Sequence, residues 1–176
     1  LQNRARVVSL SVIRHFEATP EARAAYLKQR RLMAGTPEEE GEPDEEETPV
    51  AEGQLSPERY AAMSAAENLL LTITAKGQGK LSSSHDYPVR GRGGMGVRAI
   101  DKAMRGGPVV ACFPVEMDDQ IMLATSRGQS IRVPVEGISF RSRNAGGVKV
   151  FDTREGEEVV SVAWIAEQAE DEEDEG

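Results

Sequence analysis

The stretch IMLATSRGQSIRVPVEGISFRSRNAGGVKVFD, residues 121–152, repeats an earlier stretch of the chain. The earlier copy is LLLTITAKGQGKLSSSHDYPVRGRGGMGVRAID, residues 69–101, and the offset is 51 residues from Leu70 and Ile121 onward. Identical residues occupy the equivalent positions Thr74/Thr125, Gly77/Gly128, Arg90/Arg141, Arg92/Arg143, Gly96/Gly147 and Val97/Val148. A β-rich unit with such a period is typical of propeller-like blades, each of which is too small to bury its apolar face alone.

A Val-Val segment precedes each copy, and a third one follows the second copy. Val/Ile-rich segments separated by Gly or Asp-Asp turns predict short strands in the second copy. We expect these strands at about 109–115, 120–126, 129–135 and 147–152. The chain then divides into a strand of an interrupted blade at 1–13, the rest of that blade at 68–104, a second blade at 105–155 and a closing strand at 156–166. The predicted fold class is all-β, with about two propeller-like blades and a closing strand.

The first copy contains an insertion of about 51 residues, because Val7 and Leu70 are 63 residues apart whereas Val109 and Ile121 are 12 apart. Within the inserted segment, 14–67, two Ser/Thr-Pro-Glu sequences mark helix starts, with a capping hydroxyl, a first-turn proline and a first-turn acid. They predict helices at 20–34 and 57–67 that form a hairpin. The segment 36–55 between them is strongly acidic, and we expect it to be disordered.

The net charge of −9 is unevenly distributed along the 176 residues. Residues 36–67 and 167–176 carry −17 between them, and the remainder carries +8. The acidic tail at 167–176 is expected to be disordered, with a solubilising or a regulatory role. A single cysteine excludes an internal disulfide, and no apolar run is long enough to span a bilayer. The chain begins at Leu1 without a visible signal peptide, and we expect it to be a fragment that lacks an upstream part.

The sequence RGRGGMG at Arg90–Gly96 matches the G-x-G-x-x-G pattern of dinucleotide-binding sites, but its context does not. No helix is expected after it, because residues 97–100 are typical of a strand. A loop with two arginines and little side-chain bulk suits a phosphate backbone instead. Together with bases elsewhere in the two copies it predicts a basic track for DNA, against the alternative of ordinary solvated arginines. The candidate DNA-binding residues are Lys76, Lys80, Arg90, Arg92, Arg98, Arg127, Arg132, Arg141, Arg143 and Lys149.

No catalytic or metal-binding constellation is present in the sequence. His15 and His85 lie far apart, and neither has a metal-ligand spacing to Cys112. Cys112 lies in an apolar segment, so a buried core thiol is expected, and Trp164 is expected in the core as well. The candidate sites are therefore binding sites, with no catalytic residue and no metal ligand.

The repeat, the arginine-glycine loop and the acidic end together resemble the C-terminal domain of bacterial DNA gyrase A subunits. The matching segments are LLTITAKGQGK (70–80), YPVRGRGGMGV (87–97), DDQIMLATSRGQSIRVPVEGISFRSRNAGGV (118–148) and VVSVAWIAE (159–167). The insertion VIRHFEATPEARAAYLKQRR resembles one found in some alphaproteobacterial gyrases. One departure concerns the gyrase box, a glutamine-led basic-glycine heptapeptide: the loop Arg90–Gly96 starts with arginine and has Met95 at a basic position. It is better interpreted as the equivalent loop of another blade.

The resemblance implies a β-pinwheel with a basic outer rim around which double-stranded DNA wraps. It also implies a part in a cytoplasmic, nucleoid-associated type II topoisomerase that introduces negative supercoils with ATP. The expected partners are DNA, the gyrase B subunit and a second copy of the A subunit, with no membrane. ATP and Mg²⁺ serve the whole complex and no cofactor is expected in this part, which lacks the catalytic tyrosine and would be inactive alone.

Two alternatives remain at this point. The first is the C-terminal domain of the topoisomerase IV A subunit, which bends DNA without wrapping it fully. The second is a non-catalytic β-propeller scaffold for protein partners, with the inserted helices as the docking element.

Overall fold

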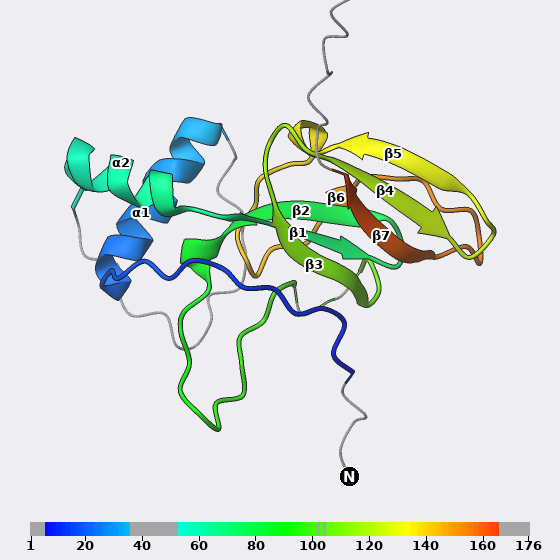
Figure 1. Ribbon diagram of the computed structural model, residues 1–176, viewed down its shortest axis with the longest axis horizontal. Helices are drawn as coiled ribbons and strands as arrows, with labels where there is room; N and C mark the ends of the chain where they lie inside the picture. Colours follow the sequence, from blue (N-terminus) through cyan, green and yellow to red (C-terminus); the bar gives the residue numbers. More distant parts are fainter. Residues whose placement is uncertain (1–5, 36–52, 102, 104, 166–176) are drawn as a thin grey trace, which may run out of the picture.

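The computed structural model describes residues 6–35, 53–101, 103 and 105–165. Two helices lie beside two antiparallel sheets (Figure 1). The tail at 167–176 and most of the expected acidic linker, residues 36–52, lie outside the described residues. In chain order the elements are α1 (Pro20–Ala34), α2 (Pro57–Ala66), β1 (Leu69–Thr74), β2 (Gln78–Ser83), the short 3₁₀ turn η1 (Ser84–Asp86), β3 (Val109–Val115), β4 (Gln120–Thr125), β5 (Ser130–Pro134), a second 3₁₀ turn η2 (Val135–Gly137), β6 (Val148–Lys149) and β7 (Val159–Ile165).

Both predicted helices are confirmed, and their starts have the expected caps. The Thr19 hydroxyl accepts a hydrogen bond from the Ala22 amide, and the Ser56 hydroxyl accepts one from the Arg59 amide, each at 3.2 Å. α1 ends at Gly35, whose φ of 64° is the left-handed conformation that glycine adopts without strain. The second helix stops one residue before its predicted end.

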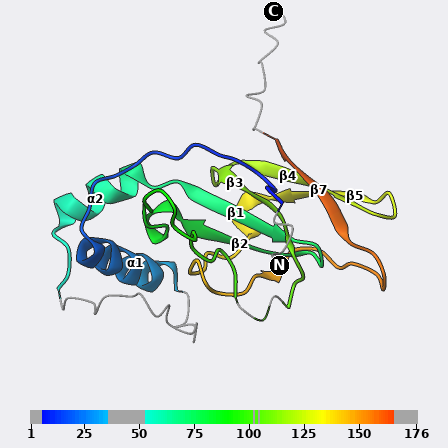
Figure 2. The same cartoon turned by 90° about the horizontal axis from the view of Figure 1, so that it is seen from below.

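The helices form a small core of their own at one end of the sheets (Figure 2). Tyr26 and Leu27 of α1 are buried against Met63 of α2, and Tyr60 lies 5.0 Å from Tyr26 between ring centroids. Phe16, Ala18 and Leu55 complete this cluster. The insertion is therefore a packed unit, and its helix α1 contacts η1, the turn that follows β2.

The first sheet has the strand order β3-β1-β2-β6, and the second has the order β5-β4-β7. Neighbouring strands are antiparallel in both sheets. One apolar core joins the sheets, because the buried side chains of β1 and β4 belong to the same cluster. Its fully buried members include Leu71, Ile73, Leu81, Ile121, Leu123, Val135 and Val159.

The four strands predicted for the second copy are all present, but they do not form one sheet. β3, which we expected to be the first strand of the second blade, pairs with β1, where Leu71 faces Phe113. β6, the last strand of the same copy, pairs with β2 through Gly79 and Val148. The second copy thus gives two strands to the sheet of the first. The predicted boundary at residue 105 separates the two copies of the sequence repeat. It does not separate the two sheets, because β3 and β6 follow this boundary and yet belong to the first sheet.

Two predicted strands are absent from the described residues. Residues 6–13 have no regular secondary structure and pair with no strand, and Val7 and Leu10 are exposed. Residues 97–100, which we expected to form a strand, have no regular structure either. These two segments are the first-copy equivalents of β3 and β6, which join the sheet of the copy that precedes their own. The described part of the chain contains no sheet before the first one, so the two segments have no such sheet to join. The Ser9 hydroxyl, 2.7 Å from the Cys112 carbonyl oxygen, ties the first of these segments to β3.

Two residues expected in the core are less buried than predicted. Trp164 on β7 is 54% exposed, and its indole Nε1 donates to Asp119 Oδ2 at 2.6 Å. Cys112 is only partly buried, with its sulfur 3.6 Å from the Thr72 hydroxyl. β3 and β7 are both edge strands of their sheets, so each pairs with a strand on one side only.

Candidate nucleic-acid interface

The ten candidate DNA-binding residues fall into three groups by exposure. Six are exposed, namely Lys76, Arg90, Arg92, Arg127, Arg132 and Lys149, and two are partly exposed, namely Arg98 and Arg141. Lys80 and Arg143 are buried, with 0% and 5% of their surface exposed. A buried side chain that donates to backbone carbonyl oxygens is poorly placed to contact a phosphate, and both of these side chains make such contacts.

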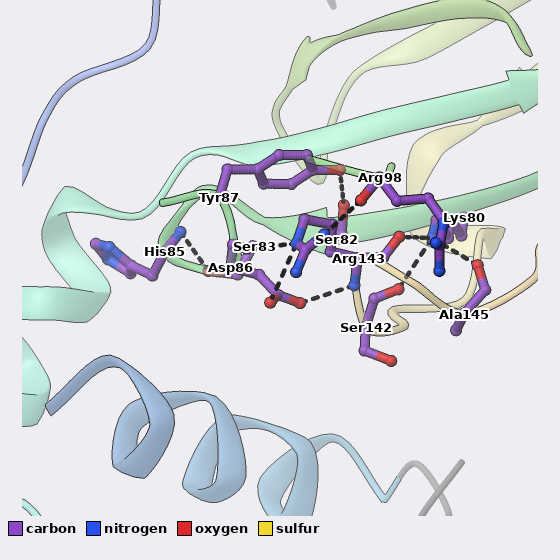
Figure 3. Close-up of polar contacts among 10 residues, drawn as sticks. All are labelled: Lys80, Ser82, Ser83, His85, Asp86, Tyr87, Arg98, Ser142, Arg143 and Ala145. Carbon is purple, nitrogen blue, oxygen red and sulfur yellow. Dashed lines mark hydrogen bonds and ion pairs between the residues drawn. The ribbon is translucent and has the colours of Figure 1, made fainter. Parts of the chain in front are cut away.

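Lys80 holds a loop in place from the middle of β2 (Figure 3). Its ammonium group donates to the backbone carbonyl oxygens of Ser142 at 2.9 Å, Arg143 at 2.5 Å and Ala145 at 2.7 Å. The three donors of a lysine ammonium are thereby matched by three acceptors, which offsets the cost of burying it. Lys80 therefore has a structural role, and its burial argues against the predicted DNA contact.

Arg143 binds the first sheet in a similar way, through η1 (Figure 3). Its backbone amide donates to Asp86 Oδ2 at 2.7 Å, and its Nε donates to the Asp86 carbonyl oxygen, also at 2.7 Å. Its Nη1 donates to the carbonyl oxygen of Arg98 at 2.6 Å. Arg143 therefore stabilises the fold, and its burial likewise argues against the predicted DNA contact.

These two cations fix the segment between η2 and β6, residues 138–147, which we call the Arg141 loop. The Leu81 amide donates to the Ser139 carbonyl oxygen at 2.9 Å, and the Arg141 amide donates to the Leu81 carbonyl oxygen at 2.7 Å. The Arg141 side chain remains partly exposed, with Nη1 3.5 Å from the Gly146 carbonyl oxygen. Arg141 thus keeps a place in the candidate interface on a loop that is held firmly.

The loop Arg90–Gly96 lies on the surface, extending from the sheets as the bright green loop in Figure 1. Gly93 and Gly96 have φ of 78° and 75°, and the Gly94 amide donates to the Gly91 carbonyl oxygen at 3.3 Å. No helix begins after it, as the sequence predicted, so the helix N-terminus that a dinucleotide pyrophosphate needs is missing from the described residues around it. Its exposed arginines suit a ligand on the outside of the molecule.

Lys76 and Arg127 occupy equivalent turns of the two copies. Each precedes a glycine of positive φ, 77° at Gly77 and 78° at Gly128. β1 and β4 point to the same side in Figure 1, so both turns lie on the side away from the helices. Arg127 is exposed and its Nη2 donates to the Glu155 carbonyl oxygen at 2.8 Å. The repeat thus places one cation at the same position of each sheet.

A buried carboxylate supports the second of these turns. Glu157 accepts hydrogen bonds from the Thr125 hydroxyl at 2.5 Å and from the Arg154 amide at 3.0 Å. The Thr125 bond, followed by the Arg154 amide, lowers the pKa of Glu157. The ionised side chain therefore joins the end of β4 to the segment before β7.

Asp86 was not predicted from the sequence, and the repeat offers only a weak signal for it. Its equivalent in the second copy is Gly137, so the acid is present in only one of the repeats. Lys80 likewise has an apolar equivalent, Ile131. An unmatched charge does not by itself identify a structural residue, because the exposed Arg132 also has an apolar equivalent, Leu81.

Within residues 6–35, 53–101, 103 and 105–165, no group of three or more His, Cys, Asp or Glu side chains is arranged to hold a metal ion. Over the same ranges, no helix has the length and apolar character that crossing a bilayer requires.

Comparison with known proteins agrees with the architecture. The DNA gyrase A subunit of Granulibacter bethesdensis is 46% identical over 170 residues, which cover 92% of this chain and 18% of that protein. The chain thus spans about a fifth of the length of this relative. Because the alignment leaves only a small part of the chain uncovered, it extends through most of the helical insertion.

Two solved structures share the fold. A structure of a DNA gyrase A C-terminal domain matches with a TM-score of 0.53 and 26% identity over 56% of this chain and 34% of that one. The C-terminal domain of DNA topoisomerase IV matches with a TM-score of 0.51 and 21% identity over 56% of this chain and 31% of that one, a likeness of fold alone. The sequence model described as "DNA gyrase C-terminal domain, beta-propeller" matches residues 68–116 and 119–163, which are more than half of the chain and comprise both sheets. The chain therefore belongs to the DNA gyrase C-terminal domain family.

Proposed function

We propose that this chain binds double-stranded DNA on its exposed bases and wraps it as part of the A subunit of a DNA gyrase. The observation that carries the proposal is the recurrence of exposed or partly exposed cations at equivalent places of a repeat whose family is established. Lys76 and Arg127 occupy one such pair of turns, and Arg90 and Arg141 lie in equivalent loops. Regularly spaced charges suit a polymer with regularly spaced phosphates.

The proposed binding is electrostatic and independent of base sequence. Arginine and lysine neutralise phosphates and release condensed counterions, so the affinity falls steeply with salt concentration. Bending DNA around a curved rim costs on the order of 1–6 kcal/mol for a short site, and contacts on successive blades offset this cost. Exposed cations on several elements therefore offset the cost of bending DNA better than one strong local site would.

In the complete enzyme, the wrap would present a DNA crossing to the cleavage core, and ATP-driven strand passage would introduce negative supercoils. The gyrase B subunit and a second copy of the A subunit are the proposed partners, and ATP with Mg²⁺ is proposed to act outside this chain. We assign no catalytic role to any described residue. The contribution of this chain is to bind and shape DNA.

A salt titration on the full-length A subunit tests the proposal. Arg127→Ala and Arg132→Ala should each weaken DNA binding and reduce the slope of log K against log salt by about 0.9, the value for one lost phosphate contact. Glu136→Ala, which removes an exposed acid between β5 and the Arg141 loop, is the control that should not weaken binding. If both arginine variants keep the wild-type affinity and slope, the interface is wrong and a protein-binding scaffold becomes the better hypothesis.

The topoisomerase IV likeness calls for a second measurement. A domain that wraps DNA changes the linking number of a closed circle after nicking and religation, whereas one that only bends DNA does not. We expect a linking-number change that is lost in the Arg127→Ala/Arg132→Ala double variant. Strong DNA binding by the wild-type protein without a linking-number change would favour the topoisomerase IV type of domain.

A further inference from the structure

The short turn η1 connects the helical insertion to the Arg141 loop through two consecutive residues. On one side, His85 is buried, and its Nε2 lies 2.7 Å from the Met63 carbonyl oxygen of α2. Its ring meets those of Tyr26 and Phe16 edge-on, at centroid distances of 5.0 and 5.8 Å. Hence His85 joins the insertion to the turn that follows β2.

On the other side, Asp86 binds the Arg141 loop. Its carboxylate accepts from the Arg143 amide, and its carbonyl oxygen accepts from Arg143 Nε. Because His85 and Asp86 are neighbours in a single 3₁₀ turn, a shift of the insertion at His85 displaces the acceptors of Arg143 as well.

A second contact runs directly from α1 to the same loop. The Arg30 guanidinium lies over the Phe140 ring, 4.7 Å from its centroid, and is held there by Glu67, whose Oε2 is 3.3 Å from Arg30 Nε. Phe140 forms an isolated parallel bridge with Leu81, and the next residue, Arg141, donates its amide to the Leu81 carbonyl oxygen. The insertion thus contacts the loop just before Arg141 and, through η1, just after it.

We propose that the helical insertion braces the Arg141 loop and so positions Arg141 for DNA, with Arg30 and His85 as positioning residues. This inference rests on the proposed function. The alternative is that the insertion binds DNA itself through the cations of α1. The contacts favour the brace, because Arg30 is engaged with Glu67 and Phe140 and only 26% of its side-chain surface is exposed.

Lys28 offers a matched control on the same helix. It is exposed to a greater extent than Arg30, and Lys28→Met removes one positive charge from α1 as Arg30→Met does. Each variant is made in the full-length A subunit, and hydrogen exchange is followed at the Arg141 and Arg143 amides by fragment-resolved mass spectrometry. DNA affinity and its salt slope are measured in parallel.

Arg30→Met should accelerate exchange at these amides about fivefold, the factor expected for the loss of one partly desolvated cation–π contact. Exchange in β4 and β5 should not change, which separates loss of the brace from general destabilisation. DNA affinity should fall while the salt slope stays constant, and Lys28→Met should alter none of these quantities. Arg30→Lys, which keeps the charge for Glu67 but loses the planar group over Phe140, should give an intermediate acceleration.

Unchanged exchange at Arg141 and Arg143 in the Arg30→Met variant would overturn the brace. Equal reductions of the salt slope by Arg30→Met and Lys28→Met would also overturn it, in favour of direct DNA contact by α1. Failure of the proposed function looks different: Arg141→Ala and Arg127→Ala would leave DNA binding intact, while the exchange of the loop would still report on the brace.

Discussion

Arg143 of the second repeat is bound by Asp86 of the first, with the Arg143 amide and Nε each 2.7 Å from an Asp86 oxygen atom. Arg143 Nε also lies 3.8 Å from Asp86 Oδ1, and both side chains are largely buried. A residue that resembled a DNA contact in the sequence therefore connects two repeats. This contact makes the Arg141 loop dependent on the preceding sheet.

Asp86→Ala should destabilise the first sheet by about 1–3 kcal/mol, because the Arg143 amide loses its acceptor and the buried guanidinium loses its nearest charge. Hydrogen exchange of the β1 and β2 amides in the full-length A subunit measures the effect. Asp152→Ala is the control, since its ion pair with Lys149 is exposed and should contribute less than about 0.5 kcal/mol. Equal effects of the two substitutions would contradict the structural role of Asp86.

Lys80→Met and Arg132→Met should have opposite profiles, although both residues were candidates for DNA binding. Lys80→Met takes the ammonium donor away from three backbone carbonyl oxygens, so we expect at least about 2 kcal/mol of lost stability in β2 and the Arg141 loop. Arg132→Met, on the exposed side of β5, should leave stability unchanged and reduce the salt slope of DNA binding by about 0.9. Hydrogen exchange and a salt titration on the same proteins provide the comparison.

The repeat and the helix-start signals were enough to predict the strands of the second copy, the helices and the class of fold. They could not predict which sheet a strand joins, since β3 has the same apolar pattern whether it pairs with β1 or with β4. The sequence also could not show which basic side chains are buried. Lys80 and Arg132 are both basic residues in strands, and only the position of the Arg141 loop over β2 distinguishes them.

Tyr87 should make the first sheet sensitive to alkaline pH. Burial raises the pKa of Tyr87 to about 12, against the opposing effect of its hydrogen bond with the Ser82 hydroxyl at 3.1 Å. The unfolded chain loses this proton near pH 10, before the folded protein does, so the stabilisation is complete below pH 10 and is lost as the pH rises toward 12.

The loss between these limits amounts to roughly 2–3 kcal/mol. Tyr87→Phe should flatten the dependence of the first sheet's stability on pH between these limits. Hydrogen exchange of its amides, corrected for the pH dependence of the intrinsic exchange rate, measures this stability. A profile as steep as that of the wild type would show that another group titrates.

Gly77 and Gly128 are equivalent in sequence, yet alanine should be tolerated very differently at the two positions. Both have a positive φ, which costs an alanine about 1 kcal/mol. At Gly128 a Cβ would meet open space, so Gly128→Ala should cost little more than this. At Gly77 a Cβ would collide with the carbonyl oxygen of Phe151, and because this contact is with backbone, no flexible side chain can move aside to relieve it.

The same turn holds the end of the second repeat, since the amides of Val150 and Phe151 both donate to the Gly77 carbonyl oxygen, at 2.9 and 3.1 Å. Gly77→Ala should therefore displace the chain around β6 and cost more than Gly128→Ala by about 1–3 kcal/mol. Thermal unfolding of the two variants, with hydrogen exchange at Val150 and Phe151, measures the difference. Equal midpoints and unchanged exchange would mean that the segment after β6 is not held by the first sheet.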